Sequence, residues 1–150
     1  MVTAPWVIHC DGSAVPNPGR MGLGAVLVAP DGVTRHHLSQ ATTFTGCNNE
    51  AELRALLLAL AALREHGACA LLIHSDNSVL VEQLGPKPGP PIARLAPLFD
   101  EARQLLKGFG PVDLRWIPRH RNGEADALAR QALGLAPKQG GTRKKKKPSP

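Results

Sequence analysis

The hydrophobic pattern of the chain changes its period once, near residue 48, and this change limits the folds that the chain can adopt. Before it, apolar residues lie in short strand-like runs at 6–10 and 23–29, and a more polar run follows at 33–41. After it, leucines recur at the spacing of one helix face: Leu53, Leu56, Leu57, Leu60 and Leu63. The pattern therefore predicts three strands followed by a long helix. Pro30-Asp31-Gly32 supplies a hairpin turn, so we expect these strands to be antiparallel.

The second half of the chain alternates between strand and helix signals. Asn48 or Asn49 is the expected N-cap of the long helix, and Gly67 is its expected stop. The proline-rich connector GPKPGPP covers 85–91. The other elements expected are a strand at 69–75, a short helix at 77–84, a helix at 92–107, a strand at 112–118 and a helix at 122–133. This order predicts one α/β domain, a mixed sheet with helices packed on it.

The positive charge of the chain belongs to its end. The net charge is +6, and the last thirteen residues, 138–150, hold six of the 18 basic side chains and no acid. The remaining body carries 12 basic and 12 acidic side chains. We therefore divide the chain into a domain at 1–137 and a basic tail at 138–150, which we expect to be disordered. The tail either solvates the protein or contacts phosphates.

Cysteine usage and hydropathy predict a cytoplasmic protein. The three cysteines are an odd number without CxxC spacing, which indicates neither a disulfide framework nor a zinc site. The longest fully apolar run, 55–63, is much shorter than the ~20 residues of a membrane span. The first residues do not have the pattern of a secretory signal. We expect no membrane contact, no obligate protein partner and a monomer.

A glycine-rich stretch follows the first strand and raises the question of a phosphate cradle. Phosphate-binding glycine loops lead into a helix. Here Gly22 and Gly24 lead into Ala-Val-Leu-Val, which is typical of a strand. The glycines are therefore expected only to shape a turn and the start of a strand.

Four acids occupy equivalent places at the ends of predicted elements. Asp11 closes the run WVIHCD, and Asp76 closes LLIHSD. Glu52 and Asp126 lie in the first turns of helices, on the stripes that face the core. Each acid alone could form a turn or complement a helix dipole. Four converging acids would repel one another unless a cation neutralised them, and oxygen-only ligands favour Mg²⁺ or Mn²⁺.

The motifs that carry these acids resemble those of the type 1 ribonuclease H family. They are DGSAVPNPGRMGLGAVL, NNEAEL, IHSDNS and NGEADALA, in this order over about residues 5 to 135. The resemblance implies the ribonuclease H-like fold, a five-stranded mixed sheet of three antiparallel and then two parallel strands with flanking helices. It also implies that Asp11, Glu52, Asp76 and Asp126 are catalytic and hold two Mg²⁺ ions, for which Mn²⁺ can substitute. Glu50 competes with Glu52 for this role, but the family pattern selects the acid after Asn-Asn-x-x, which is Glu52, and Glu50 is expected to be a solvated acid in the first turn of the helix.

The resemblance further implies an activity and a substrate. The activity is hydrolysis of the RNA strand of RNA–DNA hybrids by a two-metal mechanism, leaving 5′-phosphate and 3′-hydroxyl ends. The residues implied to bind the substrate are Gly12, Ser13, Asn17, Asn48 and Asn49. The asparagines also have local explanations, Asn17 in a turn before Pro18 and Asn48 as a helix cap.

Three features depart from the family pattern. Cys47 stands where many relatives have threonine, so a hydroxyl contact to the DNA phosphate is in question. The basic, tryptophan-bearing insertion of many bacterial members is missing between Asp76 and Trp116. The loop WIPRHRNGEAD is short, and its His120 is an auxiliary candidate for proton transfer or product release, with a solvated loop histidine as the alternative.

Two other functions are compatible with the same residues. Related carboxylate clusters serve nucleases that act on other nucleic acids. The chain has no added recognition domain, which disfavours that alternative. A noncatalytic nucleic-acid-binding module that uses the basic tail is the other alternative. It would have no need for four acids beside phosphates.

Overall fold

The computed structural model describes residues 4–136, and its centre is a five-stranded sheet in the order β3-β2-β1-β4-β5. The strands are β1 (Trp6–Val15), β2 (Gly19–Val28), β3 (Arg35–Gly46), β4 (Leu71–Ser75) and β5 (Val112–Trp116). The first three strands pair antiparallel, and β1–β4 and β4–β5 pair parallel. The mixed sheet predicted from the sequence is confirmed. The predicted division at residue 137 and the basic tail lie outside the described residues.

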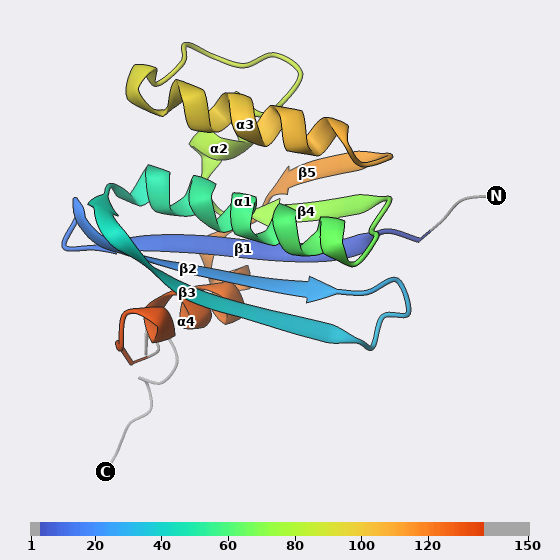
Figure 1. Cartoon of the computed structure of the whole chain (residues 1–150), viewed down its shortest axis with the longest axis horizontal. Coiled ribbons are helices and arrows are strands. Elements are labelled where there is room, and N and C mark those ends of the chain that lie inside the picture. Colours follow the sequence, from blue (N-terminus) through green and yellow to red (C-terminus); the bar gives the residue numbers. More distant parts are fainter. Residues whose placement is uncertain (1–3, 137–150) are drawn as a thin grey trace.

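Helices cover both faces of this sheet (Figure 1). The longer helices are α1 (Asn48–Glu65), α3 (Ala96–Lys107) and α4 (Gly123–Ala132), and the short ones are α2 (Ser78–Gln83), η1 (Ala93–Leu95) and η2 (Arg119–Arg121). α1 and α3 pack together on one face, and α4 packs on β1, β2 and β3 from the other. Four of the five leucines predicted to face the core, all but Leu57, are fully buried under α1. Within residues 4–136, none of the helices combines the length with the hydropathy that a membrane-spanning segment needs.

Glycines allow the helices to approach the sheet closely. A Cβ at Gly24 or Gly22 would collide with the backbone of α4, at Ala125 and Ala129. A Cβ at Gly12 would collide with the backbone of α1 at Ala51. Gly22 and Gly24 therefore lie inside β2, and because they lack a side chain the backbone of α4 can pack directly against the strand. This corrects the prediction that they only shape a turn and the start of a strand.

Several element ends differ from the prediction. The N-cap of α1 is Cys47, whose Sγ accepts from the N–H of Glu50 at 3.4 Å, and neither Asn48 nor Asn49 takes this place. Gly67 follows the helix with φ +70°, so the predicted stop is confirmed. The helix expected at 92–107 is a 3₁₀ turn followed by α3, with its proline in the first turn.

Candidate active site

The parallel pairing of β1 with β4 brings Asp11 and Asp76 together. The last paired residues are His9 and His74, and each acid lies two positions further along its strand. Asp76 follows the end of β4, but Asp11 lies inside β1, which continues to Val15 paired with β2. The prediction that Asp11 closes its strand was therefore wrong. The ladder between β1 and β4 ends at His9 and His74. Beyond His9, β1 has no partner strand on that side among the described residues, and this opens the site.

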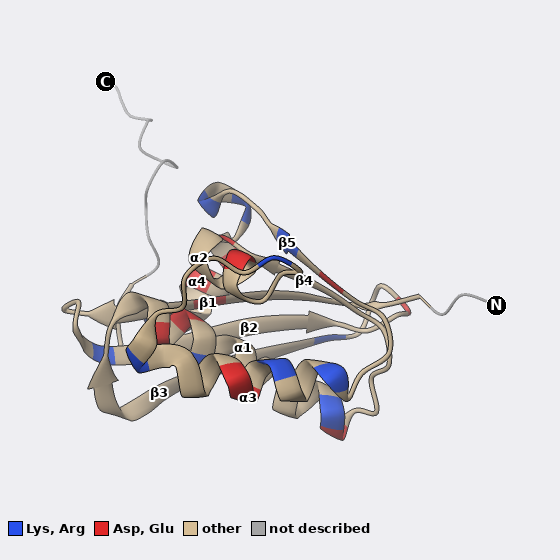
Figure 2. Ribbon diagram, turned by 90° about the horizontal axis from the view of Figure 1, so that it is seen from above, with Lys and Arg blue, Asp and Glu red and all other residues tan. Residues whose placement is uncertain are grey.

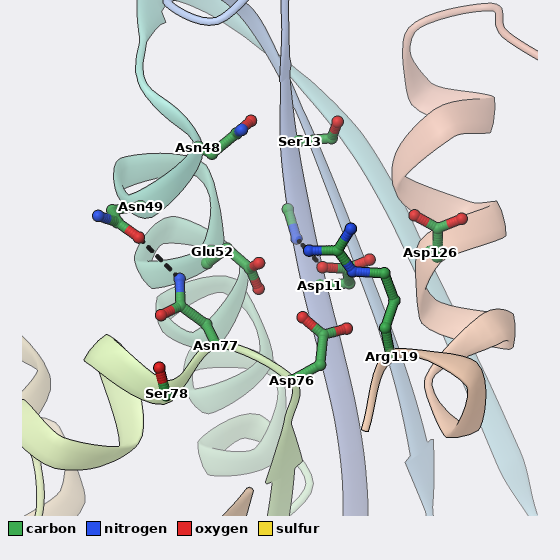
Figure 3. Close-up of a pocket in the computed structure, with 11 residues that line it drawn as sticks. Asp11, Ser13, Asn48, Asn49, Glu52, Asp76, Asn77, Ser78, Arg119 and Asp126 are labelled. Carbon is green, nitrogen blue, oxygen red and sulfur yellow. Dashed lines mark hydrogen bonds between the residues drawn. The ribbon is translucent and has the colours of Figure 1, made fainter. Parts of the chain in front are cut away.

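α1 and α4 contribute the other two acids. The backbone of α1 at Ala51 packs tightly against Gly12 of β1. Glu52 follows Ala51 and is therefore held close to β1. Ligand oxygens of Asp11, Glu52 and Asp76 all lie within 4.8 Å of one another. Asp126, in the first turn of α4, lines the same pocket of about 390 Å³ from the other side of β1 (Figure 3). The structure thus brings the four predicted acids to one pocket.

Two of these acids are held where ionisation is unfavourable. Burial, and then the charge of Asp76, raise the pKa of Asp11 to about 8. Burial, and then the charges of Asp11 and Asp76, raise the pKa of Glu52 to about 10. Among the described residues no hydrogen-bond donor reaches Glu52 Oε1, which is fully buried. An oxygen-only donor set, mutual repulsion and an unpaired buried oxygen fit a hard divalent cation.

Residues that the sequence did not single out hold Asp76 in place. Asn122 is 1% exposed, and its Nδ2 donates to Asp76 Oδ2 at 3.0 Å and to the carbonyl of Cys10 at 2.9 Å. Trp116 Nε1 donates to the Asp76 carbonyl at 3.2 Å. Asn122 also ends the loop before α4, and its carbonyl accepts from the N–H of Asp126. One residue, Asn122, therefore links β1 and Asp76 through its side-chain amide and the helix of Asp126 through its backbone carbonyl.

The predicted substrate-binding residues lie on one side of the acids. Gly12, Ser13, Asn48 and Asn49 line the pocket, and Asn17 is joined to it by accepting from the N–H of Asn48 at 3.0 Å. Asn48 Oδ1 in turn accepts from the N–H of Ala14 at 2.8 Å. Asn77 and Ser78, which the sequence did not single out, also line the pocket.

The loop between β5 and α4 places an arginine at the pocket. Arg119 lines it, and Figure 3 shows its guanidinium directed toward Asp11, with Asp76 and Asp126 nearby. It is the one basic residue that lines the pocket among the described residues, and it forms no ion pair with a carboxylate of 4–136. The predicted auxiliary residue, His120, is exposed and does not line the pocket. No sequence signal distinguishes these two neighbours, because the fold of η2 decides which one faces inward.

Two neighbours of the site have roles apart from the acids. Glu50 pairs with Arg54 at 2.8 Å and has a side chain only 16% exposed, so it is not the solvated acid that was expected. Arg94 Nη2 donates to Cys47 Sγ at 2.8 Å. Burial opposes ionisation of this thiol, but the hydrogen bonds from Glu50 N and Arg94 outweigh it and lower the pKa of Cys47.

Known proteins resemble the chain in sequence and in fold. The profile of the reverse transcriptase-like family matches residues 9–132. A bifunctional protein of Mycobacterium tuberculosis is 33% identical over 130 residues, which are 87% of this chain and 36% of that protein. The structure of its N-terminal RNase H domain covers 86% of this chain and 98% of that domain with a TM-score of 0.80. The chain therefore spans about a third of the length of this relative.

Two further solved structures share the fold. RNase H1 of the archaeon Halobacterium salinarum is 32% identical with a TM-score of 0.81, over 87% of this chain and 98% of that one. A complex of LC11-RNase H1 with an RNA/DNA hybrid is 27% identical with a TM-score of 0.74, over 86% of this chain and 96% of that one.

Proposed function

The chain belongs to the reverse transcriptase-like family, together with the type 1 ribonucleases H, and from this we propose that it hydrolyses the RNA strand of RNA–DNA hybrids. The observation that carries the proposal is the convergence of Asp11, Glu52 and Asp76 within 4.8 Å, with Asp126 in the same pocket. A cluster of this kind has one evident use beside a phosphate backbone, which is to hold divalent cations. The expected products have 5′-phosphate and 3′-hydroxyl ends.

The four acids are proposed to bind the metal ions, and neighbouring groups hold the acids in position. Asp11, Glu52, Asp76 and Asp126 would hold two Mg²⁺ ions, or Mn²⁺ in their place. When bound, such ions supply an activated water and stabilise the leaving 3′ oxygen. Asn122 fixes the rotation of the Asp76 carboxylate, and Gly12 N donates to Asp11 Oδ1 at 3.0 Å. The protein therefore contributes mainly a fixed geometry of oxygens.

The predicted substrate-binding asparagines favour a nucleic-acid strand that carries hydrogen-bond acceptors. The Oδ1 atoms of Asn17 and Asn48 accept backbone N–H groups, and Asn49 Oδ1 accepts from a side chain. An amide offers one oxygen and one amino group, so the NH₂ group of each asparagine is left as a donor. None of these amino groups has an acceptor within residues 4–136. A ribose 2′-oxygen is such an acceptor, and DNA lacks it, which is the basis we propose for selecting RNA.

A panel of labelled duplexes tests the proposal. The protein is incubated with RNA–DNA hybrid, double-stranded RNA and double-stranded DNA, each with Mg²⁺, Mn²⁺ or EDTA. We expect metal-dependent cleavage of the hybrid alone, within its RNA strand. Cleavage of another duplex would support a nuclease with a different substrate. Binding without cleavage in any metal would support a noncatalytic module.

Arg119 is expected to act on the substrate phosphate. An unpaired guanidinium beside four acids can bind a phosphoryl oxygen as the negatively charged strand enters the site. We expect Arg119→Ala to lower kcat about 10- to 100-fold, the range of roughly 1.5–3 kcal/mol for a hydrogen bond to a charged group. Arg119→Lys should recover part of this loss, and His120→Ala is the matched control and should keep kcat within about threefold. Equal losses in both alanine variants would contradict this assignment.

The basic tail, which lies outside the described residues, is expected to strengthen binding. Acidic and basic residues are interspersed along the described elements (Figure 2). Deleting residues 138–150 should raise KM, leave kcat largely intact and flatten the dependence of affinity on salt. The log–log slope should fall by roughly 0.7–0.9 for each phosphate that the truncated protein no longer neutralises. An unchanged slope in the truncated protein would exclude this role.

A cytoplasmic location and a monomeric state stay predictions from the sequence.

A further inference from the structure

The residue after Asp76, Asn77, is hydrogen-bonded to the side chain of Asn49 at one side of the pocket. Its Nδ2 donates to Asn49 Oδ1 at 2.9 Å, and this hydrogen bond joins the start of α2 to the start of α1 (Figure 3). Asn49 and Asn77 are both only partly exposed, and both line the pocket. Neither the sequence motifs nor the acidic cluster assigns a role to Asn77.

A backbone hydrogen bond determines which of the two asparagines is the donor. Asn77 is the N-cap of α2, and its Oδ1 accepts from the N–H of Leu80 at 3.1 Å. Its own N–H donates to Ser75 Oγ at 3.1 Å. A backbone N–H cannot accept, so the Asn77 amide has its oxygen toward α2 and its NH₂ toward Asn49. Asn49 must then accept with its oxygen, and its own NH₂ remains for a ligand.

We propose that Asn77 is a positioning residue that orients the Asn49 amide as a hydrogen-bond donor toward the nucleic acid. This rests on the proposed function, because it takes a nucleic-acid strand as the ligand of the pocket. An amide without this anchor could turn by 180° and present its oxygen to the strand. An oxygen there would lie against the acceptor atoms that the strand carries at its ribose, its base edges and its phosphates, so that binding would weaken.

The arrangement around Asn48 provides an internal comparison. Its Oδ1 is held by the N–H of Ala14, and its orientation therefore owes nothing to Asn77. Both asparagines present an NH₂, but only one depends on α2. A change at Asn77 should therefore act through Asn49 and leave Asn48 unaffected.

A double-mutant cycle tests the proposal. Asn77→Ser keeps a neutral helix cap but is too short to reach Asn49, whereas Asn77→Ala loses both functions. The dissociation constant of a labelled RNA–DNA hybrid is measured by fluorescence anisotropy in the Asp11→Asn background, which keeps the substrate intact. Thermal unfolding of each variant separates loss of the cap from loss of orientation. Initial rates in the wild-type background give kcat and KM for the same changes.

We expect Asn77→Ser and Asn49→Ala each to raise the dissociation constant about fivefold, the effect of one lost hydrogen bond. The double variant should bind no more weakly than Asn49→Ala, and KM should rise far more than kcat falls. In an Asn48→Ala background, Asn77→Ser should keep its full effect. Additive effects at positions 77 and 49, or no effect of Asn77→Ser, would overturn the proposal. Coupled binding effects without hybrid cleavage by the wild type would overturn the proposed function and leave the positioning role standing.

Discussion

Asp11→Asn is expected to reduce cleavage of an RNA–DNA hybrid by about three orders of magnitude or more at saturating Mg²⁺. One carboxylate oxygen of Asp11 lies within 4.8 Å of an oxygen of Glu52 and of an oxygen of Asp76. The variant removes one negative charge and leaves an amide of nearly the same shape. Metal ions lower the barrier of such reactions by several kcal/mol, and each 1.36 kcal/mol is a factor of about ten in rate. The measurement is the initial rate on labelled hybrid, with both proteins at equal concentration.

The same variant is expected to fold as well as the wild type. Asp11 is 6% exposed, and the one N–H group that donates to it within residues 4–136 is that of Gly12, so its ionised form opposes folding when no cation is bound. We expect the melting temperature of Asp11→Asn in EDTA to equal or exceed that of the wild type. The matched control is Glu50→Gln, which removes an acid from the same helix as Glu52 but outside the pocket. Magnesium-dependent cleavage by Asp11→Asn within tenfold of the wild-type rate would refute the assignment.

The fold could be predicted from the sequence because each element carries a local signal. The leucine stripe of α1, Gly67 at its end and the turn at Asp31-Gly32 depend on neighbouring residues alone, and the structure has all three. The element order then leaves few sheet arrangements. The glycines of β2 had a signal that was interpreted too narrowly, because glycine inside a strand also marks the close approach of another backbone.

The four acids could be predicted, but the residues that support them could not. Asp11 and Asp76 end similar apolar runs, and two helices begin near the other acids, but it is the resemblance to the type 1 ribonuclease H motifs that groups these four acids into one candidate site. Asn122 and Asn77 make hydrogen bonds that depend on where the β1–β4 ladder ends, and Arg119 reaches the pocket because of how η2 folds. Each of them has at least one neighbour in sequence with a polar side chain: His120, Arg121 and Ser78. Only the tertiary structure distinguishes Arg119 from His120.

The acids also predict that the protein without metal loses stability as pH rises. A carboxyl group whose pKa is higher in the folded protein binds more protons there, so its stabilising contribution is full below its unfolded pKa and disappears above its folded pKa. For Asp11 this window runs from the ordinary value of 3.8 to about 8, and for Glu52 from 4.5 to about 10. His9 acts in the opposite direction, because burial and then His74 lower its pKa, but this contribution is common to wild type and Asp11→Asn. The wild-type melting temperature minus that of Asp11→Asn, measured in EDTA, should therefore fall between pH 5 and 8.

Divalent cations should reverse this trend, because they bind the ionised acids and only the folded protein brings these acids together. A cation at 100 times its dissociation constant stabilises by about 2.7 kcal/mol, which corresponds to roughly 5–10 °C in melting temperature for a domain of this size. We expect Mg²⁺ to raise the wild-type melting temperature by this amount at pH 8 and by much less at pH 5, where protons compete for the same oxygens. Asp11→Asn should lose most of the increase, and Glu50→Gln should keep it. The reason is that Asp11 belongs to the cluster, whereas Glu50 already pairs with Arg54. A magnesium-dependent increase that is the same at both pH values, or the same in Asp11→Asn, would show that the cation binds elsewhere than at these carboxylates.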